Sequence, residues 1–358
     1  AERFRLIEYL LFTAVTLATA VVCVCLGSVS VPLNETVSAI AGAVRGIFTG
    51  IAPPETTHST VILSVRLPRV LAVALTGASL SLCGAAVQGL LRNPLADASN
   101  LGVSSGAAVG AVLSIAFGFS IPGFYDAGVM TSAIVFAFLS LVLILTLSYK
   151  LDFSLSTNTI ILIGLIFTMF ASSITSLVTT FAGSKVNSIV FWMMGSLSGA
   201  KYRDVVVLAV SLVVFGAVIF YYARELNAFA IGEDNARNIG VNVERVKFAI
   251  LVAVSALVGV CVSIGGSIGF VGLVMPHMTR MIVGPNHRRL LPAVTFSGAV
   301  FLMLADLVAR TILSPRELPI GVVTSFVGAF AFVLIFYQTR KGRRGCSVSR
   351  ISQSASRI

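Results

Sequence analysis

The sequence predicts an all-α protein that crosses a membrane about ten times. Of its 358 residues, 57% are hydrophobic and only 11% are charged, whereas soluble domains carry about 25% charged residues. The apolar residues form long continuous runs, unlike the short alternating segments of outer-membrane barrels. A spanning helix needs roughly 20 apolar residues, so the composition can supply about ten. A soluble enzyme and a disordered chain are both excluded.

Ten apolar runs follow one another along the chain, and we interpret each as a spanning helix. They cover residues 8–26, 67–91, 99–119, 127–149, 157–181, 205–222, 246–266, 270–283, 290–313 and 318–337. The first run is too long for a signal-peptide core and no persuasive cleavage site follows it, so we expect it to be retained. The eighth is short and contains Pro276, so we expect it to be buried among other helices.

The basic residues orient these spans. With the N-terminus in the cytoplasm, 17 of the 25 lysines and arginines fall on the cytoplasmic side and 8 on the outer side, as the positive-inside rule requires. The net charge of +11 therefore reflects topology, and we expect no nucleic-acid partner. The sequence predicts one transmembrane domain over 1–358 in the bacterial cytoplasmic membrane. Its parts are a cytoplasmic N-terminus (1–7), a ten-helix core (8–337) and a basic cytoplasmic tail (338–358).

Small residues mark helix packing in the predicted core. Gly102, Gly106 and Gly110 repeat at four-residue spacing, so they share one helix face and let a neighbouring helix approach closely. Four of the five cysteines lie inside apolar runs and none forms a C-x-x-C pair, so we expect them to behave as buried apolar residues. Three scattered histidines do not make a metal site. We therefore expect neither a metal nor a covalently bound cofactor.

Two polar segments are too specific to be ordinary loops. The first, Gln88 to Asp97, closes the second span; Pro94 ends that helix, and Asp97 or Ser99 is expected to cap the next one. The second, 226–245, joins spans six and seven on the cytoplasmic side. Within it, residues 232–240 predict a short helix with an acidic start and a glycine stop. A small apolar face formed by Ala236 and Ile239 suits docking to a soluble partner.

At this point the sequence resembles the membrane permease subunit of ATP-binding-cassette (ABC) importers for iron–siderophore complexes, haem and cobalamin. The resemblance covers residues 60–340 and depends on six motifs in order. These are Arg66-Leu-Pro-Arg69, Arg92-Asn-Pro-Leu-Ala-Asp97, Leu101-Gly-Val-Ser-Ser-Gly106, Gly272-Leu-Val-Met-Pro-His277, Ala305-Asp306-Leu-Val-Ala-Arg310 and Glu317-Leu-Pro-Ile-Gly-Val322.

The resemblance implies a vitamin B12-importer-like fold and a set of partners. These are a second permease subunit, two ATPase subunits and an extracytoplasmic substrate-binding protein. ATP is then hydrolysed by a partner, because the chain lacks the G-x-x-x-x-G-K-[ST] motif that cradles nucleotide phosphates. It has no nucleophile–base set either, so we expect a transport subunit and not an enzyme.

Three groups of residues take roles from the resemblance. ATPase coupling falls on Gly232, Glu233, Asp234, Asn235, Ala236, Arg237 and Gly240. Binding-protein docking falls on Arg66, Arg69 and Arg310, although Arg310 lies four residues after Asp306 and can instead pair within its helix. The inner gate falls on Asn93, Leu95, Ser156 and Thr157, and the translocation path on Thr168, Ser172 and Thr175 of the fifth span. Hydrogen bonding of these path residues to neighbouring helices is the alternative.

Several alternatives stay open at this stage. A ferric siderophore is the first choice of substrate, with cobalamin or haem as the others, and the two permease subunits can be identical or different. An ion-coupled secondary transporter is the alternative class. It would need an ionisable residue at mid-membrane; Asp306 is the best candidate, and Arg310 can neutralise it.

Overall fold

The computed structural model describes residues 4–27, 32–49, 57–119, 127–153 and 156–333, and over these ranges the chain is helical without a strand. The predicted all-α membrane class is confirmed. Seven helices are long and apolar enough to cross a membrane, and three shorter apolar helices accompany them. Each of the ten coincides with one of the ten predicted runs.

The bounds of these helices are as follows. The long ones are α1 (Leu6–Cys25), α4 (Leu67–Leu90), α6 (Ala127–Leu151), α7 (Thr157–Phe181), α9 (Tyr202–Tyr221), α12 (Val243–Gly265) and α14 (His287–Thr311). The shorter ones are α5 (Val103–Phe117), α13 (Val271–Val283) and the helix Ile320–Val333. The chain enters α4 through α3 (Thr57–Val61) and a π-helical turn, η1 (Ile62–Arg66), and the apolar helix that they form with α4 covers the 32 residues Ser59–Leu90.

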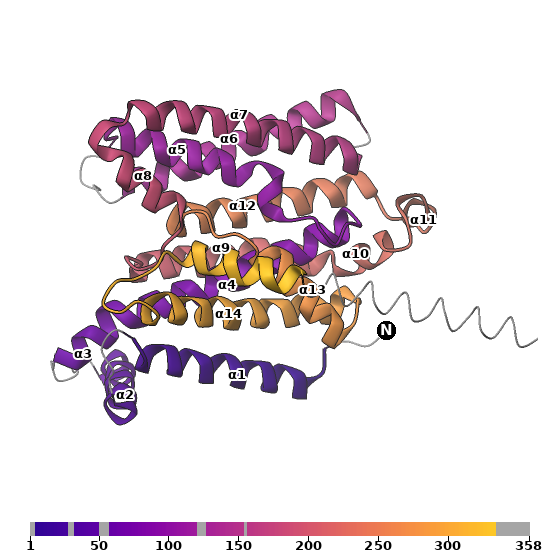
Figure 1. Cartoon of the computed structure of the whole chain (residues 1–358). Helices are drawn as coiled ribbons and strands as arrows, with labels where there is room; N and C mark the ends of the chain where they lie inside the picture. Colours follow the sequence, from indigo (N-terminus) through magenta and orange to yellow (C-terminus); the bar gives the residue numbers. More distant parts are fainter. Residues whose placement is uncertain (1–3, 28–31, 50–56, 120–126, 154–155, 334–358) are drawn as a thin grey trace, which may run out of the picture.

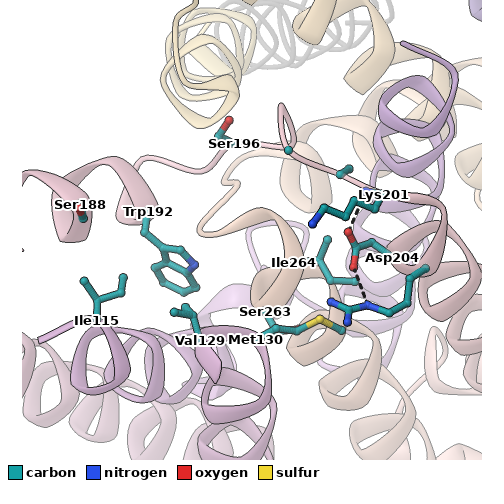
Figure 2. Close-up of a pocket in the computed structure, with 13 residues that line it drawn as sticks. Ile115, Val129, Met130, Ser188, Trp192, Ser196, Lys201, Asp204, Ser263 and Ile264 are labelled. Carbon is teal, nitrogen blue, oxygen red and sulfur yellow. Dashed lines mark hydrogen bonds and ion pairs between the residues drawn. The ribbon is translucent and has the colours of Figure 1, made fainter. Parts of the chain in front are cut away.

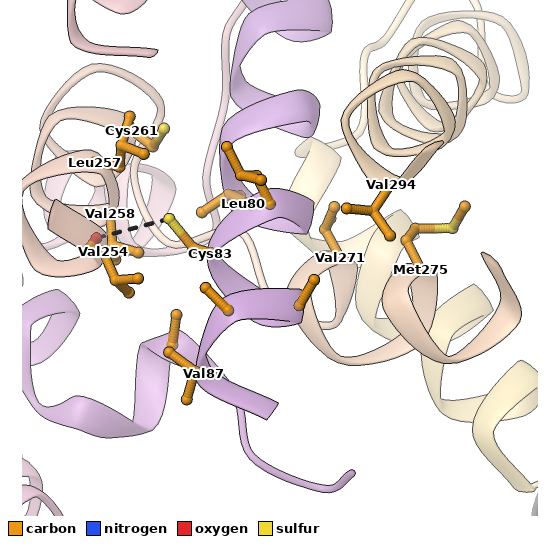
Figure 3. Close-up of a cluster of buried hydrophobic side chains, with 14 of the residues drawn as sticks. Leu80, Cys83, Val87, Val254, Leu257, Val258, Cys261, Val271, Met275 and Val294 are labelled. Atoms are coloured by element: carbon orange, nitrogen blue, oxygen red, sulfur yellow. Dashed lines mark hydrogen bonds between the residues drawn. The ribbon is translucent and has the colours of Figure 1, made fainter. Parts of the chain in front are cut away.

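The helix α4 occupies the centre of the bundle (Figure 1). It contacts α14, α13, α12, α9 and α1, while α5, α6 and α7 pack together on the far side of α12. Figure 3 shows the core where α4 meets α12, α13 and α14. There the Cys83 thiol donates to the Val254 carbonyl over 3.7 Å. The four cysteines of the described residues are buried and free, as predicted; Cys346 lies outside them.

Glycines bring the helices into close contact. A Cβ added to Gly106 would meet Ser140 and the Phe136 carbonyl of α6, and one on Gly110 would meet the Ser132 carbonyl. The predicted packing role of these two glycines is therefore confirmed. The same holds inside α4, where Gly84 lies directly against the Gly272 carbonyl of α13.

The predicted start of the third span is wrong. After Pro94 the chain makes a 3-10 turn, η2 (Ala98–Leu101), and α5 begins only at Val103. The N-cap residue of α5 is Gly102, with a φ of +85°, and not one of the two predicted residues. Glycine adopts this left-handed backbone easily, so a turn of glycine geometry takes the place of the predicted side-chain cap.

Short helices lie at both ends of the bundle (Figure 1). At one end, which we call the α11 end, α10 (Ala223–Phe229) and α11 (Glu233–Asn238) lie near the first turns of α12 and α14. At the other, the α8 end, lie α2 (Leu33–Thr49), α3 and α8 (Val186–Met193). These last three helices lie between the predicted spans, in parts of the chain for which the sequence pattern predicted no helix.

Candidate functional site

The predicted short helix is present as α11. Gly232 precedes it with a φ of +116° and Gly240 follows it with a φ of +91°, while Glu233 and Asp234 occupy its first turn. The predicted apolar face is wrong, because Ala236 is fully buried whereas Ile239 is 64% exposed. The helix ends at Asn238, so Ile239 belongs to the turn beyond it and faces outward.

A buried ion pair holds α11 against α12. The Lys247 ammonium is fully buried and lies 2.8 Å from Oε2 of Glu233. At the surface, the Arg237 guanidinium lies 3.6 Å from the Glu244 carboxylate. Asn235 donates back to the Ile231 carbonyl over 2.7 Å. One face of the segment is thus fixed to α12, while Ile231 and Ile239 are exposed.

A second attachment joins α10 to α14. Oδ1 of Asn227 accepts from the His287 backbone N–H over 2.8 Å and lies 2.9 Å from the His287 Nδ1. The Asn227 amide also donates to Oδ1 of Asn286, the N-cap residue of α14. Close by, Arg289 pairs with Glu8 of α1. The sequence alone suggested no role for Lys247 or Asn227, because their partners lie on other helices.

At the α8 end, Arg69 binds two carboxylates. Its Nε and Nη2 lie 3.1 and 2.9 Å from Oδ1 of Asp306, and its Nη1 lies 2.8 Å from Oε2 of Glu317. Arg310 lies 3.4 Å from the other Asp306 oxygen, which confirms the alternative intrahelical pair. Two planar guanidinium groups thus share one buried carboxylate, and the charge-assisted hydrogen bonds of Arg69 tie α4 to α14.

The end of α1 completes this arginine cluster. Nη1 of Arg66 donates to the Val24 and Cys25 carbonyls over 2.9 and 3.0 Å, and Arg310 donates to the Cys23 carbonyl over 2.5 Å. The three arginines predicted to dock a binding protein are therefore brought together, and each is less than 10% exposed. Glu317, which the sequence placed only in a motif, has a side chain that is 37% exposed. Docking itself stays a prediction.

The predicted gate residues lie in two turns at the α11 end. Oδ1 of Asn93 accepts from the Leu95 N–H over 2.9 Å, and Leu95 is half exposed. Ser156 caps α7, with its own N–H donating to Asp152 over 3.1 Å. The 3-10 turn η2, which follows the first of these turns, contacts α7. The Thr157 side chain lies outside the described residues.

The predicted path residues on α7 do not share one environment. Thr168 donates to the Gly164 carbonyl over 2.8 Å and accepts from Ser105 of α5 over 3.4 Å, and Thr175 is buried. Only Ser172 is exposed. For Thr168 the helix–helix alternative is supported. The exposed face instead carries Ser172, Ser173, Ser176 and Thr180 among apolar side chains, a strip that the sequence prediction captured only in part.

A cavity of about 450 Å³ opens at the α8 end and is lined by residues of α5, α6, α8, α9 and α12 (Figure 2). Trp192, Lys201 and Arg203 are among its lining residues. Asp204 offsets part of this positive charge, because its carboxylate lies 3.8 Å from Arg203 and accepts from the Lys201 N–H over 2.9 Å. Within the described ranges, no group of three or more His, Cys, Asp or Glu residues could hold a metal ion.

Apolar helices surround a central span, the short polar helix α11 is attached at one end of the bundle, and a buried arginine cluster lies at the other end. These features are those of a multi-pass membrane transport subunit. Residues 15–338 match the FecCD transport family, and the chain belongs to it. The sequence resemblance is thereby confirmed. The family is that of ABC permease subunits.

Relatives agree over most of the chain. It is 39% identical to YvrB of Bacillus subtilis, an uncharacterized ABC transporter permease, over 93% of both chains. It is 38% identical to the cobalamin import permease BtuC of Halobacterium salinarum, covering 79% of this chain and 74% of that one. It is 37% identical to the molybdate import permease MolB of Haemophilus influenzae, covering 80% and 85%. Relatives at 36% identity are named for hemin and iron(3+)-hydroxamate transport.

A solved structure resembles the fold closely. It is an inward-facing conformation of a transporter assigned to the metal-chelate type of ABC transporter. The TM-score is 0.79 at 33% sequence identity, covering 91% of this chain and 97% of that chain.

Proposed function

We propose that the chain is the permease subunit of an ATP-driven importer that moves a bulky iron chelate across the bacterial cytoplasmic membrane by alternating access. A ferric siderophore is the proposed substrate, with cobalamin or haem as alternatives. Two permease subunits would enclose the path, with both termini in the cytoplasm. Relatives of similar identity are named for cobalamin, molybdate, hemin and iron(3+)-hydroxamate. Sequence identity therefore does not choose the substrate.

The proposal depends on α11, a surface helix that is attached to the bundle by buried contacts. The chain itself has no nucleotide-binding motif. Ile231 and Ile239, which flank α11, are exposed, whereas Glu233 and Ala236 connect the helix to the core. If a soluble ATPase bound α11 and moved it, the movement would pass to α12 through Lys247. It would also pass to α14 through Asn227 of the neighbouring helix α10. In this way, ATP hydrolysis by a soluble partner could move the spanning helices.

The arginine cluster supports docking of a binding protein in a specific form. Arg66 and Arg310 bind carbonyls at the end of α1, and Arg69 binds Asp306 deep in the bundle. Glu317 is the partly exposed partner. We propose that an acidic residue of the binding protein competes with Glu317 for Arg69, because a guanidinium offers several donors to carboxylates.

The ion-coupled alternative finds less support. It needs an ionisable residue that can exchange a proton or ion at mid-membrane. Asp306 lies 2.9 Å from Arg69 and 3.4 Å from Arg310, so each of its carboxylate oxygens already has a cationic partner. A structural role for this carboxylate therefore accounts for its position.

Reconstitution tests the proposal. The permease would be placed in liposomes with its ATPase and binding protein, and ATP turnover measured with a ferric hydroxamate, haem, cobalamin or molybdate. We expect the ferric hydroxamate to stimulate turnover and to accumulate inside. Stimulation by another of these compounds alone would overturn the substrate assignment, and substrate accumulation without the ATPase would overturn the importer mechanism.

A further inference from the structure

A groove lies between α6 and α12 where these helices end, next to α11. It has a volume of about 490 Å³, and its lining includes Leu145, Tyr149 and Lys150 from α6 and Glu244, Arg245 and Phe248 from α12. This volume falls within the range of ligand sites, ~300–1,000 Å³. The groove is separate from the arginine cluster and from the predicted gate and path residues. Two of its lining residues, Glu244 and Arg245, end the polar segment 226–245, and the others have no assigned role.

The charges of the groove are arranged for an anion. Within the described part of the chain, the exposed side chains of Lys150 and Arg245 have no ion pair or hydrogen bond. Glu244 does not neutralise them directly, because its carboxylate pairs with Arg237 of α11 at 3.6 Å. Two cations therefore point into solvent beside an apolar surface. A zwitterionic headgroup would bring its own cation toward them, whereas an anionic phosphodiester would not.

The depth of the groove matches the shape of a lipid. Lys150 is the second-last residue of α6 and Arg245 is the third residue of α12, so both lie where apolar helices leave the membrane. Leu145 lies five residues before Lys150, roughly 7–8 Å deeper along the helix. Phe248 lies one turn deeper than Arg245. Tyr149, whose ring stacks edge-on against Phe153 at 5.2 Å, stands at the level that aromatic side chains prefer.

We infer that this groove binds an anionic phospholipid, with the headgroup phosphate between Lys150 and Arg245 and an acyl chain along Leu145 and Phe248. Basic pockets between spanning helices on the cytoplasmic side are suited to anionic headgroups. The inference rests on the proposed function only in placing the α11 end at the cytoplasmic leaflet. A protein partner is a weaker fit, because the basic residues continue directly into an apolar wall at membrane depth.

Fluorescence quenching tests the inference in the permease alone. Trp192 is the only tryptophan, so Phe248→Trp in a Trp192→Phe background places a single reporter in the groove. The variant is reconstituted in phosphatidylcholine vesicles that contain brominated phosphatidylglycerol or brominated phosphatidylcholine at equal mole fraction. From the quenching, we expect brominated phosphatidylglycerol to bind the groove several-fold more tightly than brominated phosphatidylcholine. Lys150→Gln and Arg245→Gln should each reduce this preference about fivefold at most, the share of one basic residue, and together abolish it.

The control is Arg224→Gln, which removes one exposed positive charge at the same end of the bundle and should leave the preference intact. Equal quenching by the two lipids in the parent, or equal loss in the control, would overturn the inference. Native mass spectrometry of the unaltered permease with equal amounts of both lipids gives a second readout that needs no reporter. It should retain phosphatidylglycerol preferentially, and equal retention would count against the site.

The lipid site can be distinguished from a subunit contact and from the proposed function. If the double variant keeps its lipid preference but loses ATPase binding, the groove is a subunit contact and the lipid inference is overturned. If lipid preference behaves as expected while transport fails for every substrate tested, the proposed function fails and the lipid site stands.

Discussion

The Lys247 ammonium on α12 is fully buried and lies 2.8 Å from the Glu233 carboxylate, which opens α11. The Glu233 side chain is 27% exposed, so only one member of the pair is removed from water. A buried charge whose partner is removed is costly, while replacement by an apolar side chain of similar size is often tolerated. Substituting Lys247 or Glu233 should therefore have different effects: replacement of the buried lysine tests coupling, and replacement of the partly exposed glutamate tests stability.

Lys247→Met should preserve the fold and weaken coupling. The methionine fills the buried site, and Glu233 can turn toward water, so α11 loses its ion pair with α12 without leaving a buried charge. We expect transport per ATP hydrolysed to fall several-fold in proteoliposomes. Glu233→Ala should lower stability further, by as much as ~3–5 kcal/mol, because it removes the carboxylate that lies 2.8 Å from the buried ammonium. Asp234→Ala, which alters the exposed neighbour, is the stability control; equal destabilisation of the two acidic variants would contradict the prediction.

Asn227→Ala should uncouple α10 from α14. The side chain makes three contacts with Asn286 and His287, so its loss costs several hydrogen bonds at about 1 kcal/mol each. Asn227→Asp keeps the Oδ1 acceptor for the His287 N–H and loses only the donor to Asn286. We expect transport coupling in the order wild type, Asn227→Asp, Asn227→Ala, with ATPase binding unchanged. An aspartate variant no better than alanine would show that Oδ1 is not the important atom.

Asp306→Asn should destabilise the bundle more than any exposed charge change at the α8 end. The substitution keeps the size of the side chain but leaves Arg69 and Arg310 without their shared buried charge. Breaking such a pair costs about 3–5 kcal/mol, which thermal unfolding in detergent would detect. Arg316→Gln, at an exposed position nearby, should stay within about 0.5 kcal/mol. If both variants unfold at the same temperature, the cluster contributes little to stability.

Gly84→Ala should also be destabilising, although it adds a single methyl group. The new Cβ would collide with the Gly272 backbone of α13, and overpacking of this kind costs about 1–3 kcal/mol. Gly199→Ala provides the matched control, because nothing lies within 4 Å of a Cβ at that position. Comparable yield and unfolding temperature for the two variants would mean that α4 and α13 can separate at no cost.

The helices were predictable because apolar runs of spanning length report directly on the membrane. The side-chain pairs that join one helix to another were not predictable from the sequence. Arg69 and Asp306 are separated by 237 residues, and an arginine at the end of an apolar run is expected to face water unless its partner is known. The Asp306–Arg310 pair was predictable because both residues lie on one helix at four-residue spacing. The start of α5 was missed because the backbone of Gly102, and not a capping side chain, determines it.

The exposed face of α7 offers the final test, which concerns the proposed path. Ser172 and Ser176 are one turn apart and exposed, whereas Thr175 is buried. Thiols react as thiolates and need access to water, and the four native cysteines of the described residues are buried. With Cys346 replaced by serine, a water-soluble maleimide should therefore label Ser172→Cys and Ser176→Cys in the assembled importer and leave Thr175→Cys unlabelled. Protection of both exposed positions would show that this face contacts lipid or protein, and a path along α7 would be excluded.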